Sequence, residues 1–254
     1  MTDPLFSVAG RVVLVTGGSR GLGRAMCLSL AERGARVIVA SRKIDACEQL
    51  ATQIRERGGE AGALACHVGD WASLDHVVAA AADRWGRLDG LINNAGMSPL
   101  APSLIDTSEA LFDKVIGVNL KGPTRLTALA AQAMTKTGGG SIVNISSLAS
   151  VKPTPVATTY SAAKAGLNAL TRAAALEYAA AAIRVNGIVC GTFDTDAAAG
   201  FVRNSELLPE VVRPIALGRV GRPEEIVGAA IYLLSDASSY TTGALIKIDG
   251  GVSG

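Results

Sequence analysis

A tyrosine and a lysine four positions apart, Tyr160 and Lys164, are the residues best suited to chemistry, and they open an apolar, alanine-rich segment. In a helix this spacing places both side chains on one face. A free tyrosine has a pKa near ~10, and an ammonium about 4 Å away favours the phenolate by at most ~4 kcal/mol at an effective dielectric of 20. The pKa then falls by at most ~3, before the cost of burial is counted. The pair therefore predicts a proton-transfer site with Tyr160 as general acid and base.

Ser147 is the residue expected to hold a substrate oxygen. It follows an apolar run over residues 141–146 that predicts a strand, and parallel sheets bind ligands at the ends of their strands. A hydroxyl there can donate a hydrogen bond to a carbonyl that gains negative charge during hydride addition. Ser146 is an adjacent alternative. Taken singly, a Tyr-x-x-x-Lys is usually part of a surface helix and a Ser-Ser pair is usually a turn, so other motifs have to support the assignment.

A glycine-rich turn, residues 16–23, follows the first predicted strand and precedes a predicted helix over residues 22–33. Such a turn lets the backbone approach a pyrophosphate, while the helix N-terminus supplies free N–H groups. The glycine spacing differs from the commonest dinucleotide fingerprint, and a glycine cluster alone is also typical of a tight turn. The expected cofactor contacts here are Gly17, Ser19, Arg20, Gly21, Leu22 and Gly23.

The end of the second predicted strand carries cations where NAD-binding proteins have an acid for the ribose 2′-hydroxyl. The chain reads Ser41-Arg42-Lys43 there, and Arg20 of the glycine turn adds a third positive charge. Because a guanidinium pairs well with a 2′-phosphate, these residues favour NADP(H) over NAD(H). NAD(H) stays as the alternative, since Arg42 and Lys43 also suit a solvated loop.

Short apolar runs alternate with helix-like segments along the whole chain. Continuous apolar runs are typical of strands covered on both faces, and repeated strand–helix–strand units cross over in one hand. The sequence predicts an α/β fold of the Rossmann type, a doubly wound seven-stranded parallel sheet with helices on both faces, in a single domain over residues 1–254. The predicted strands are residues 12–15, 37–39, 62–68, 88–93, 141–146, 183–189 and 244–248.

The composition argues against several classes of protein. The net charge of +2 arises from 24 basic and 22 acidic residues without a basic cluster, which disfavours nucleic acid as a partner. The sequence has no apolar run of the ~20 residues that a membrane span needs. Residues 1–4 lack the features of a secretion signal, so a cytoplasmic location is expected. Four scattered cysteines and two separate histidines predict no metal site.

Together the motifs resemble the short-chain dehydrogenase/reductase family over nearly the whole chain. Residues 16–23 match its T-G-x-x-x-G-x-G, residues 93–96 match its N-N-A-G, and Tyr160 with Lys164 matches Y-x-x-x-K at the expected distance from Ser147. The resemblance implies an NADP(H)-dependent oxidoreductase that interconverts a ketone or aldehyde and an alcohol. It implies that Tyr160 moves the proton, Lys164 binds the nicotinamide ribose and lowers the tyrosine pKa, and Ser147 orients the carbonyl.

The same resemblance adds residues that the chemistry of the side chains does not reveal. It makes Asn119 the fourth catalytic residue, holding a water that links Lys164 to solvent, whereas residue chemistry alone makes Asn119 a polar residue inside a helix. It also implies further cofactor contacts beside Tyr160 and Lys164. These are Val68, Asn93, Ala95, Gly96, Gly191, Thr192 and Thr195.

Two positions depart from the family pattern. His67 stands where many relatives have an aspartate for the adenine amine, so that contact falls to the backbone at Val68 or is absent. Cys190 stands where the family commonly has a proline, next to the expected nicotinamide site. Because no base or cation adjoins Cys190 in the sequence, we interpret it as a small filler and not as a reactive thiol.

The remaining expectations concern substrate and assembly. Residues 192–220 are the predicted lid, and their mostly apolar content suggests a ketone, aldehyde or acyl-linked ketone as the small-molecule substrate. The C-terminal segment, residues 218–251, resembles the family ending that accompanies homotetramers. Two other functions stay open, namely reduction of a 3-oxoacyl thioester on an acyl-carrier protein and a non-catalytic dinucleotide-binding sensor.

Overall fold

The computed structural model describes residues 3–253, and it contains a seven-stranded parallel sheet. The order of the strands across the sheet is β3-β2-β1-β4-β5-β6-β7. The strands are β1 (Val12–Thr16), β2 (Arg36–Ser41), β3 (Glu60–Ala65), β4 (Gly90–Asn93), β5 (Gly140–Ser147), β6 (Ile183–Cys190) and β7 (Leu245–Ile248). The predicted doubly wound α/β fold is confirmed.

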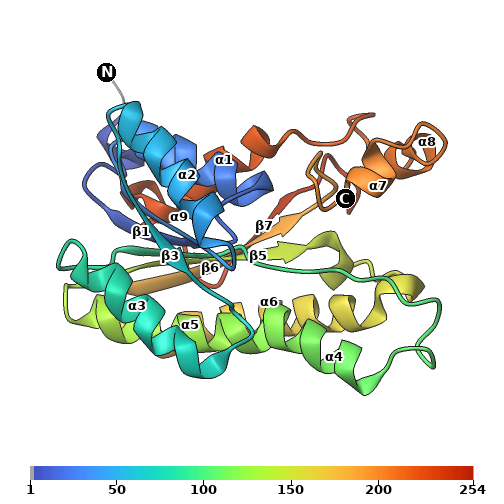
Figure 1. The fold of residues 1–254 in the computed structure, drawn as a ribbon, viewed down its shortest axis with the longest axis horizontal. Coiled ribbons are helices and arrows are strands. Elements are labelled where there is room, and N and C mark those ends of the chain that lie inside the picture. The colour runs from blue at the N-terminus through green and yellow to red at the C-terminus, as the bar shows by residue number, and fades with distance from the viewer. Residues whose placement is uncertain (1–2, 254) are drawn as a thin grey trace.

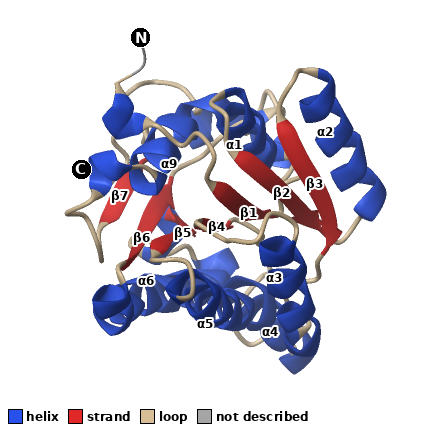
Figure 2. Ribbon diagram, turned by 90° about the vertical axis from the view of Figure 1, so that its left-hand side faces the viewer, coloured by secondary structure: helices blue, strands red, loops and turns tan. Residues whose placement is uncertain are grey.

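Helices cover both faces of the sheet (Figure 1). On the upper face in that view lie α1 (Gly21–Glu32), α2 (Ile44–Glu56) and α9 (Val227–Leu234). On the lower face lie α3 (Leu74–Asp83), α4 (Glu109–Ile116), α5 (Gly122–Thr135) and α6 (Thr158–Tyr178). Two short helices, α7 (Ala199–Val202) and α8 (Leu208–Val212), project beyond the right-hand end of the sheet. Figure 2 shows the same layers from one side. Within residues 3–253 no helix is long and apolar enough to cross a bilayer.

The central strands are apolar on both faces because each face has its own core. In β1, Val13 and Val15 pack into the core between the sheet and helices α1, α2 and α9. Val12 and Leu14 pack into the core between the sheet and helices α3, α5 and α6. All four side chains are fully buried. Burial of each such side chain contributes about 1.5–3 kcal/mol to the stability of the folded chain. Burial on both faces explains why the strands read as continuous apolar runs and not as an alternating pattern.

The third strand differs from the prediction, since it spans residues 60–65 and not 62–68. β3 lies at the edge of the sheet and pairs only with β2, from Arg36 opposite Glu60 to Ser41 opposite Ala65. It therefore ends where β2 ends, and Cys66 N–H makes one last bond to the Ser41 carbonyl oxygen. Val68 consequently lies in the following loop. The fourth strand also begins at Gly90 instead of Leu88.

The order of the strands creates one place where a ligand fits best. From β1 the chain adds β2 and then β3 on one side, and it then returns to add β4, β5, β6 and β7 on the other side. The connections after β1 and β4 thus leave in opposite directions. A crevice forms outside the carboxyl ends of these two neighbouring strands, as in other doubly wound sheets.

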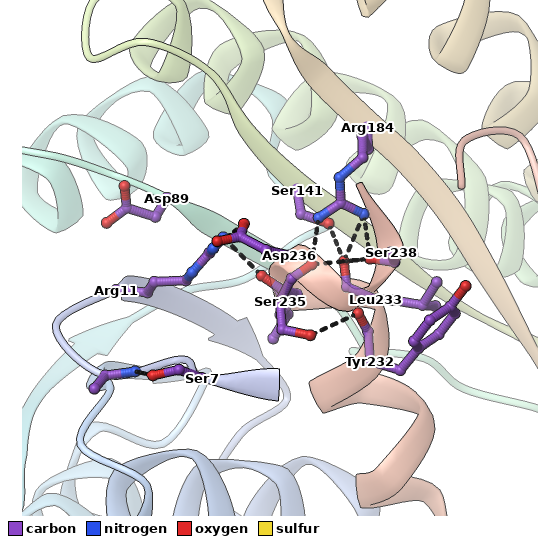
Figure 3. A network of polar contacts seen from close by, with 12 residues as sticks. Ser7, Arg11, Asp89, Ser141, Arg184, Tyr232, Leu233, Ser235, Asp236 and Ser238 are labelled. Carbon is purple, nitrogen blue, oxygen red and sulfur yellow. Dashed lines mark hydrogen bonds and ion pairs between the residues drawn. The ribbon is translucent and has the colours of Figure 1, made fainter. Parts of the chain in front are cut away.

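At the amino-terminal ends of the strands, two arginines bind the carbonyl groups at the end of α9 (Figure 3). Arg184 of β6 donates to the carbonyl oxygens of Leu233 at 2.9 Å and Ser235 at 3.1 Å, and Arg11 donates to that of Leu234 at 2.8 Å. The last carbonyl groups of a helix have no N–H partner within the helix and carry partial negative charge. The two guanidinium groups therefore attach α9 to the amino-terminal ends of β1 and β6.

We expect Arg184→Met to lower the free energy of unfolding by about 1–3 kcal/mol, because it leaves the Leu233 and Ser235 carbonyl groups without these donors. Urea unfolding followed by circular dichroism measures the change. Arg172→Met is the matched control, since Arg172 is exposed on α6 and has no ion pair within residues 3–253. Its expected effect is under about 0.5 kcal/mol. Equal stabilities of the two variants would contradict a structural role for Arg184.

Candidate active site

Ser147 and Tyr160 meet at the carboxyl ends of the central strands. Ser147 is the last residue of β5, and Tyr160 lies in the first turn of α6. The Ser147 hydroxyl is close enough to the phenol to lower its pKa, but burial is the larger effect and raises the pKa of Tyr160 above its usual value. The Ser146 hydroxyl is buried and donates to the backbone oxygen of Lys164 at 3.5 Å. Of the two serines, Ser147 is therefore the one that acts on the phenol.

Lys164 lies one helical turn after Tyr160, as predicted, and only 4% of its surface is exposed. Its ammonium donates to the carbonyl oxygen of Ile145 in β5 at 2.8 Å and lies 5.8 Å from the centre of the Tyr160 ring. Burial lowers the pKa of Lys164 to about 8. The expected lowering of the Tyr160 pKa is not found, because desolvation of the phenol is the dominant effect.

Asn119 is fully buried in a π-helical turn, Gly117–Lys121, between α4 and α5. Pro123, four residues later, has no N–H for the Asn119 carbonyl group, which favours such a local widening of the helix. The Asn119 amide accepts from Met97 N–H at 3.2 Å and donates to the carbonyl oxygens of Met97 and Val115, both at 2.9 Å. Asn119 therefore attaches the loop after β4 to the helix.

The side chain of Asn119 also approaches Lys164 across Gly96. A Cβ atom placed on Gly96 would be 3.0 Å from Asn119 Oδ1 and 3.7 Å from Lys164 Nζ. Glycine keeps the space between these two polar groups open. The water link between Asn119 and Lys164 that the family resemblance implies stays a prediction.

Cys190 ends β6 and pairs with Ser147 of β5 across the sheet. Burial raises the pKa of its thiol to about 12, while the Lys164 ammonium acts in the opposite direction. The sequence did not reveal this neighbouring cation, because Lys164 comes from a different segment of the chain. A thiol with so high a pKa stays protonated at neutral pH, which agrees with its interpretation as a small filler.

The glycine turn has the geometry of a phosphate-binding loop. Gly17 has φ +62° and Gly21 has φ +53°, which are left-handed conformations that favour glycine. A Cβ atom on Gly23 would be 2.2 Å from the Gly17 carbonyl oxygen, so this position also excludes a side chain. Arg20 precedes α1 without capping it through its side chain. The first N–H groups of α1 are therefore available to a phosphate, and the loop fits a dinucleotide.

Thr16 and Asn94 hold this loop, and neither was predicted as a site residue. The Thr16 hydroxyl accepts from the N–H groups of Asn94 at 3.0 Å and Ala95 at 3.2 Å. Asn94 Nδ2 donates to the carbonyl oxygens of Thr16 at 2.9 Å and Gly17 at 3.1 Å. Both residues belong to the two motifs that were recognised, so the signal was present. These bonds join β1 to β4 at the point where the strand order reverses.

The side chain of Asn93 points into the core of the sheet. It is 2% exposed and donates to Asn144 Oδ1 at 2.8 Å within the sheet core. Asn144 in turn donates to the Thr171 hydroxyl of α6 at 2.9 Å. Asn93 thus connects β4, β5 and α6, and only its main chain is left for a cofactor. The adjacent Ala95 and Gly96 lie in the loop that follows.

The tip of β2 lies against the glycine turn. The hydroxyls of Ser19 and Ser41 are 3.0 Å apart, and Gly18 N–H donates to the Ala40 carbonyl oxygen at 3.1 Å. The neighbouring side chains of Arg20, Arg42 and Lys43 are exposed, and within the described residues none of the three forms an ion pair. The structure therefore gathers the three predicted cations at one end of the site.

The other predicted cofactor contacts lie at the same side of the sheet, beyond the carboxyl ends of the strands. Val68 is buried in the loop after β3, and His67 is exposed beside it. Gly191 follows β6, and Thr192 accepts from the N–H of Gly221 at 2.9 Å. The methyl group of Thr195 would lie 3.4 Å from a Cβ atom on Gly21, so this segment reaches the glycine turn. Leu22 and Gly23 lie in the first turn of α1.

Several known proteins are similar to this chain in architecture and in sequence. The family model described as enoyl-(acyl carrier protein) reductase matches residues 17–253. The chain is 37% identical over 248 residues to a 3-oxoacyl-acyl-carrier-protein reductase of Thermotoga maritima, covering 96% of this chain and 98% of the relative. A solved structure from Sinorhizobium meliloti, assigned as a short-chain alcohol dehydrogenase, superposes with a TM-score of 0.94 at 40% identity and covers 98% of each chain.

A second solved structure contains a nucleotide. It comes from Agrobacterium tumefaciens, is assigned as a 2-deoxy-D-gluconate 3-dehydrogenase and has bound NADP. It superposes with a TM-score of 0.90 at 35% identity, covering 98% of this chain and 99% of that one.

The burial of Lys164 predicts a pH dependence of stability. Its pKa is about 8 in the folded chain and 10.5 for an unperturbed lysine, so between these values the unfolded chain binds more protons and stability rises with pH. Relative to Lys164→Met, the wild-type free energy of unfolding should rise by up to about 3 kcal/mol across this window. Urea unfolding at several pH values measures it. Lys152→Met, which removes an exposed lysine, should reproduce the wild-type curve, and parallel curves for wild type and Lys164→Met would be inconsistent with a buried ammonium.

Proposed function

The chain belongs to the short-chain dehydrogenase/reductase family, and we propose that it interconverts a ketone or aldehyde and its alcohol with NADP(H), using Tyr160 as proton donor and acceptor. The family supports the coarser part directly, since the chain is an oxidoreductase that acts on a CH–OH/C=O pair with NAD(P). The observation that carries the finer proposal is the proximity of the Tyr160 phenol to the Ser147 hydroxyl, beside a buried ammonium at the end of β5.

Two hydroxyl groups that lie this close can both hydrogen-bond to one substrate oxygen. When bound, the nicotinamide supplies the hydride for reduction of the carbonyl or accepts it from the alcohol. Ser147 donates a hydrogen bond to the substrate oxygen and stabilises the negative charge that develops there. Tyr160 gives that oxygen its proton. Because burial raises the pKa of the phenol, Tyr160 is protonated at neutral pH, which is the state that reduction requires.

Lys164 and Asn119 would act through the tyrosine. With a pKa of about 8, Lys164 is largely charged at neutral pH, and its ammonium lies 5.8 Å from the centre of the Tyr160 ring, where it would favour a phenolate. It would also hold the nicotinamide ribose. Asn119 faces Lys164 across Gly96, where a water would pass protons between the lysine and solvent. These positions match the family roles, which remain part of the proposal.

NADP(H) is the proposed cofactor because of the charge at the tip of β2. Arg20, Arg42 and Lys43 are exposed cations next to the glycine turn, and a guanidinium can pair with a 2′-phosphate through two hydrogen bonds. The NADP in the Agrobacterium tumefaciens structure supports this choice. We further propose a cytoplasmic location, and separately a homotetramer, which rests on the resemblance of residues 218–251 to the family ending.

Reduction of a 3-oxoacyl thioester is the second candidate, because the Thermotoga maritima relative is named for that reaction. It uses the same carbonyl chemistry at Ser147 and Tyr160. A dinucleotide sensor without turnover is the least supported function, since the four catalytic candidates are all present.

Tyr160→Phe removes only the phenol oxygen, and kcat with NADPH and a ketone should fall at least about 100-fold, the usual contribution of general acid catalysis. NADPH affinity, measured by fluorescence titration, should stay within about twofold of the wild-type value because the ring still fills its place. Tyr178→Phe, at the other end of α6, is the control and should keep wild-type turnover. Undiminished turnover by Tyr160→Phe would exclude Tyr160 as the proton donor.

Arg42→Asp should weaken binding of NADPH at least about tenfold, equivalent to ~1.4 kcal/mol, because a carboxylate would repel the 2′-phosphate. NADH lacks this phosphate, so its Kd should stay unchanged or decrease. Fluorescence titration with both nucleotides measures the ratio. Arg57→Asp, just beyond the far end of α2, controls for the change in net charge. An unaltered NADPH to NADH ratio would refute the assignment of Arg42.

A further inference from the structure

Three loops follow the carboxyl ends of β4, β5 and β6, and they surround the place where Tyr160 and Ser147 meet. They span residues 94–108, 148–157 and 191–222. Eight of the fifteen exposed large apolar side chains of the described residues lie in these loops, although the loops are a minor part of the chain. Exposed apolar surface is thus concentrated around the candidate active site.

Hydrogen bonds hold these loops beside one another. Ala101 N–H of the first loop donates to the Val156 carbonyl oxygen of the second at 3.0 Å. Leu100 is 52% exposed and Val156 is 44% exposed, so apolar surface from both loops is accessible there. The third loop is closed at its base by pairing of Phe193 with Gly221. It carries α7 and α8, which Figure 1 shows beyond the end of the sheet.

The charged groups of the third loop are largely neutralised by one another. Arg203 pairs with Asp194 at 3.1 Å and with Asp196 at 3.4 Å. The other ion pairs are Arg213 with Glu210, Arg219 with Glu225 and Arg222 with Glu225. Each guanidinium of this loop is therefore already engaged by a carboxylate.

Lys152, in the second loop, is the one basic residue of the three loops that has no ionic partner among residues 3–253. Asp106 of the first loop and Glu206 of the third form no ion pair within the same residues. A carboxylate or phosphate on the substrate would thus find one exposed lysine, no free guanidinium and two uncompensated acids. Burying such an anion without a partner is costly.

We propose that the substrate is an uncharged ketone with an apolar chain of several carbons, or the corresponding secondary alcohol; this rests on the function proposed above. The carbonyl group of the substrate lies at Tyr160 and Ser147. Its apolar chain lies against Leu100 of the first loop, Val156 of the second loop and Phe201 of the third loop. In the reduction, the carbonyl carbon gains a hydride from NADPH and the oxygen gains a proton from Tyr160. The products are the alcohol and NADP⁺.

The proposed substrate of this protein differs in chemistry from the substrate that names one of its structural relatives. A gluconate derivative, such as the one that names the Agrobacterium tumefaciens protein, carries a carboxylate and many hydroxyl groups. The loops of this chain offer apolar surface where such a molecule needs hydrogen bonds and a cation. The same charge balance gives an acidic carrier protein little attraction to these loops, because Lys152 is their one basic residue without an ionic partner among residues 3–253.

Two ketones of equal length test the proposal with the full-length protein and NADPH. The first is 2-octanone, and the second is 7-oxooctanoate, in which the terminal methyl group is replaced by a carboxylate. We expect kcat/KM at least about tenfold higher for 2-octanone. From 2-butanone to 2-octanone, kcat/KM should rise with each methylene, up to about fourfold per group, the factor that corresponds to 0.8 kcal/mol of burial. A preference for the keto acid, or no dependence on chain length, overturns the proposal.

A variant distinguishes binding of the substrate's apolar chain from the reaction at the carbonyl group. Phe201→Ser should lower kcat/KM for 2-octanone at least about fivefold and leave that for 2-butanone within twofold, since the short ketone does not reach α7. Leu5→Ser is the matched control, because Leu5 is 55% exposed in the N-terminal segment before β1. Equal losses for both ketones in Phe201→Ser, or equal effects of the two variants, count against the proposal.

Binding measurements distinguish a failure of this inference from a failure of the proposed function. If no ketone is reduced, the proposed function fails, and isothermal titration calorimetry of the two octanone analogues with the NADP⁺-saturated protein then decides the substrate class. Tighter binding of 2-octanone supports an apolar, uncharged ligand. Tighter or equal binding of 7-oxooctanoate, or binding of neither compound, overturns it.

Discussion

The burial of one ammonium, that of Lys164, is the constraint on which the candidate active site depends. A buried charge is unfavourable unless a partner compensates it, and within residues 3–253 the ammonium donates to the carbonyl oxygen of Ile145 in β5. The bond attaches the start of α6 to the end of β5. Because Tyr160 and Lys164 are one turn apart and Ser147 is two residues after Ile145, the same contact brings the phenol to the serine hydroxyl. The compensation is incomplete, as the lowered pKa of Lys164 shows.

A second set of bonds positions the nucleotide end of the site relative to this centre. Thr16 at the end of β1 and Asn94 after β4 bind each other at the point where the strand order reverses. Asn119 attaches the loop after β4 to α4 and faces Lys164 across Gly96. The glycine turn and the catalytic candidates are therefore connected through short polar contacts that span β1, β4 and α6. A ligand that binds both ends would span a framework of fixed length.

The two ends of the site differ in polarity, and this difference agrees with the proposed pair of ligands. At the tip of β2 three cations are exposed without ionic partners in the described part of the chain, which suits a phosphorylated nucleotide. Around Tyr160 the loops expose apolar side chains, and their arginines are paired with acids. Electrostatic attraction would hold the cofactor, whereas removal of apolar surface from water would hold the substrate. Cys190 fits the second environment, because its protonated thiol behaves as a small apolar group.

The sequence by itself determined the features that local patterns encode. Continuous apolar runs predicted seven strands because a strand buried on both faces needs apolar residues at every position, and the glycines of residues 17–23 predicted a phosphate loop because left-handed and crowded positions require them. Only the tertiary structure decided properties that depend on partners distant in the chain. β3 ends at Ala65 because β2 ends at Ser41, and Asn93 faces the core because Asn144 of β5 accepts its hydrogen bond. The Tyr160 pKa rises and a cation lies beside Cys190 because desolvation and charge act through space, between segments that only folding brings together.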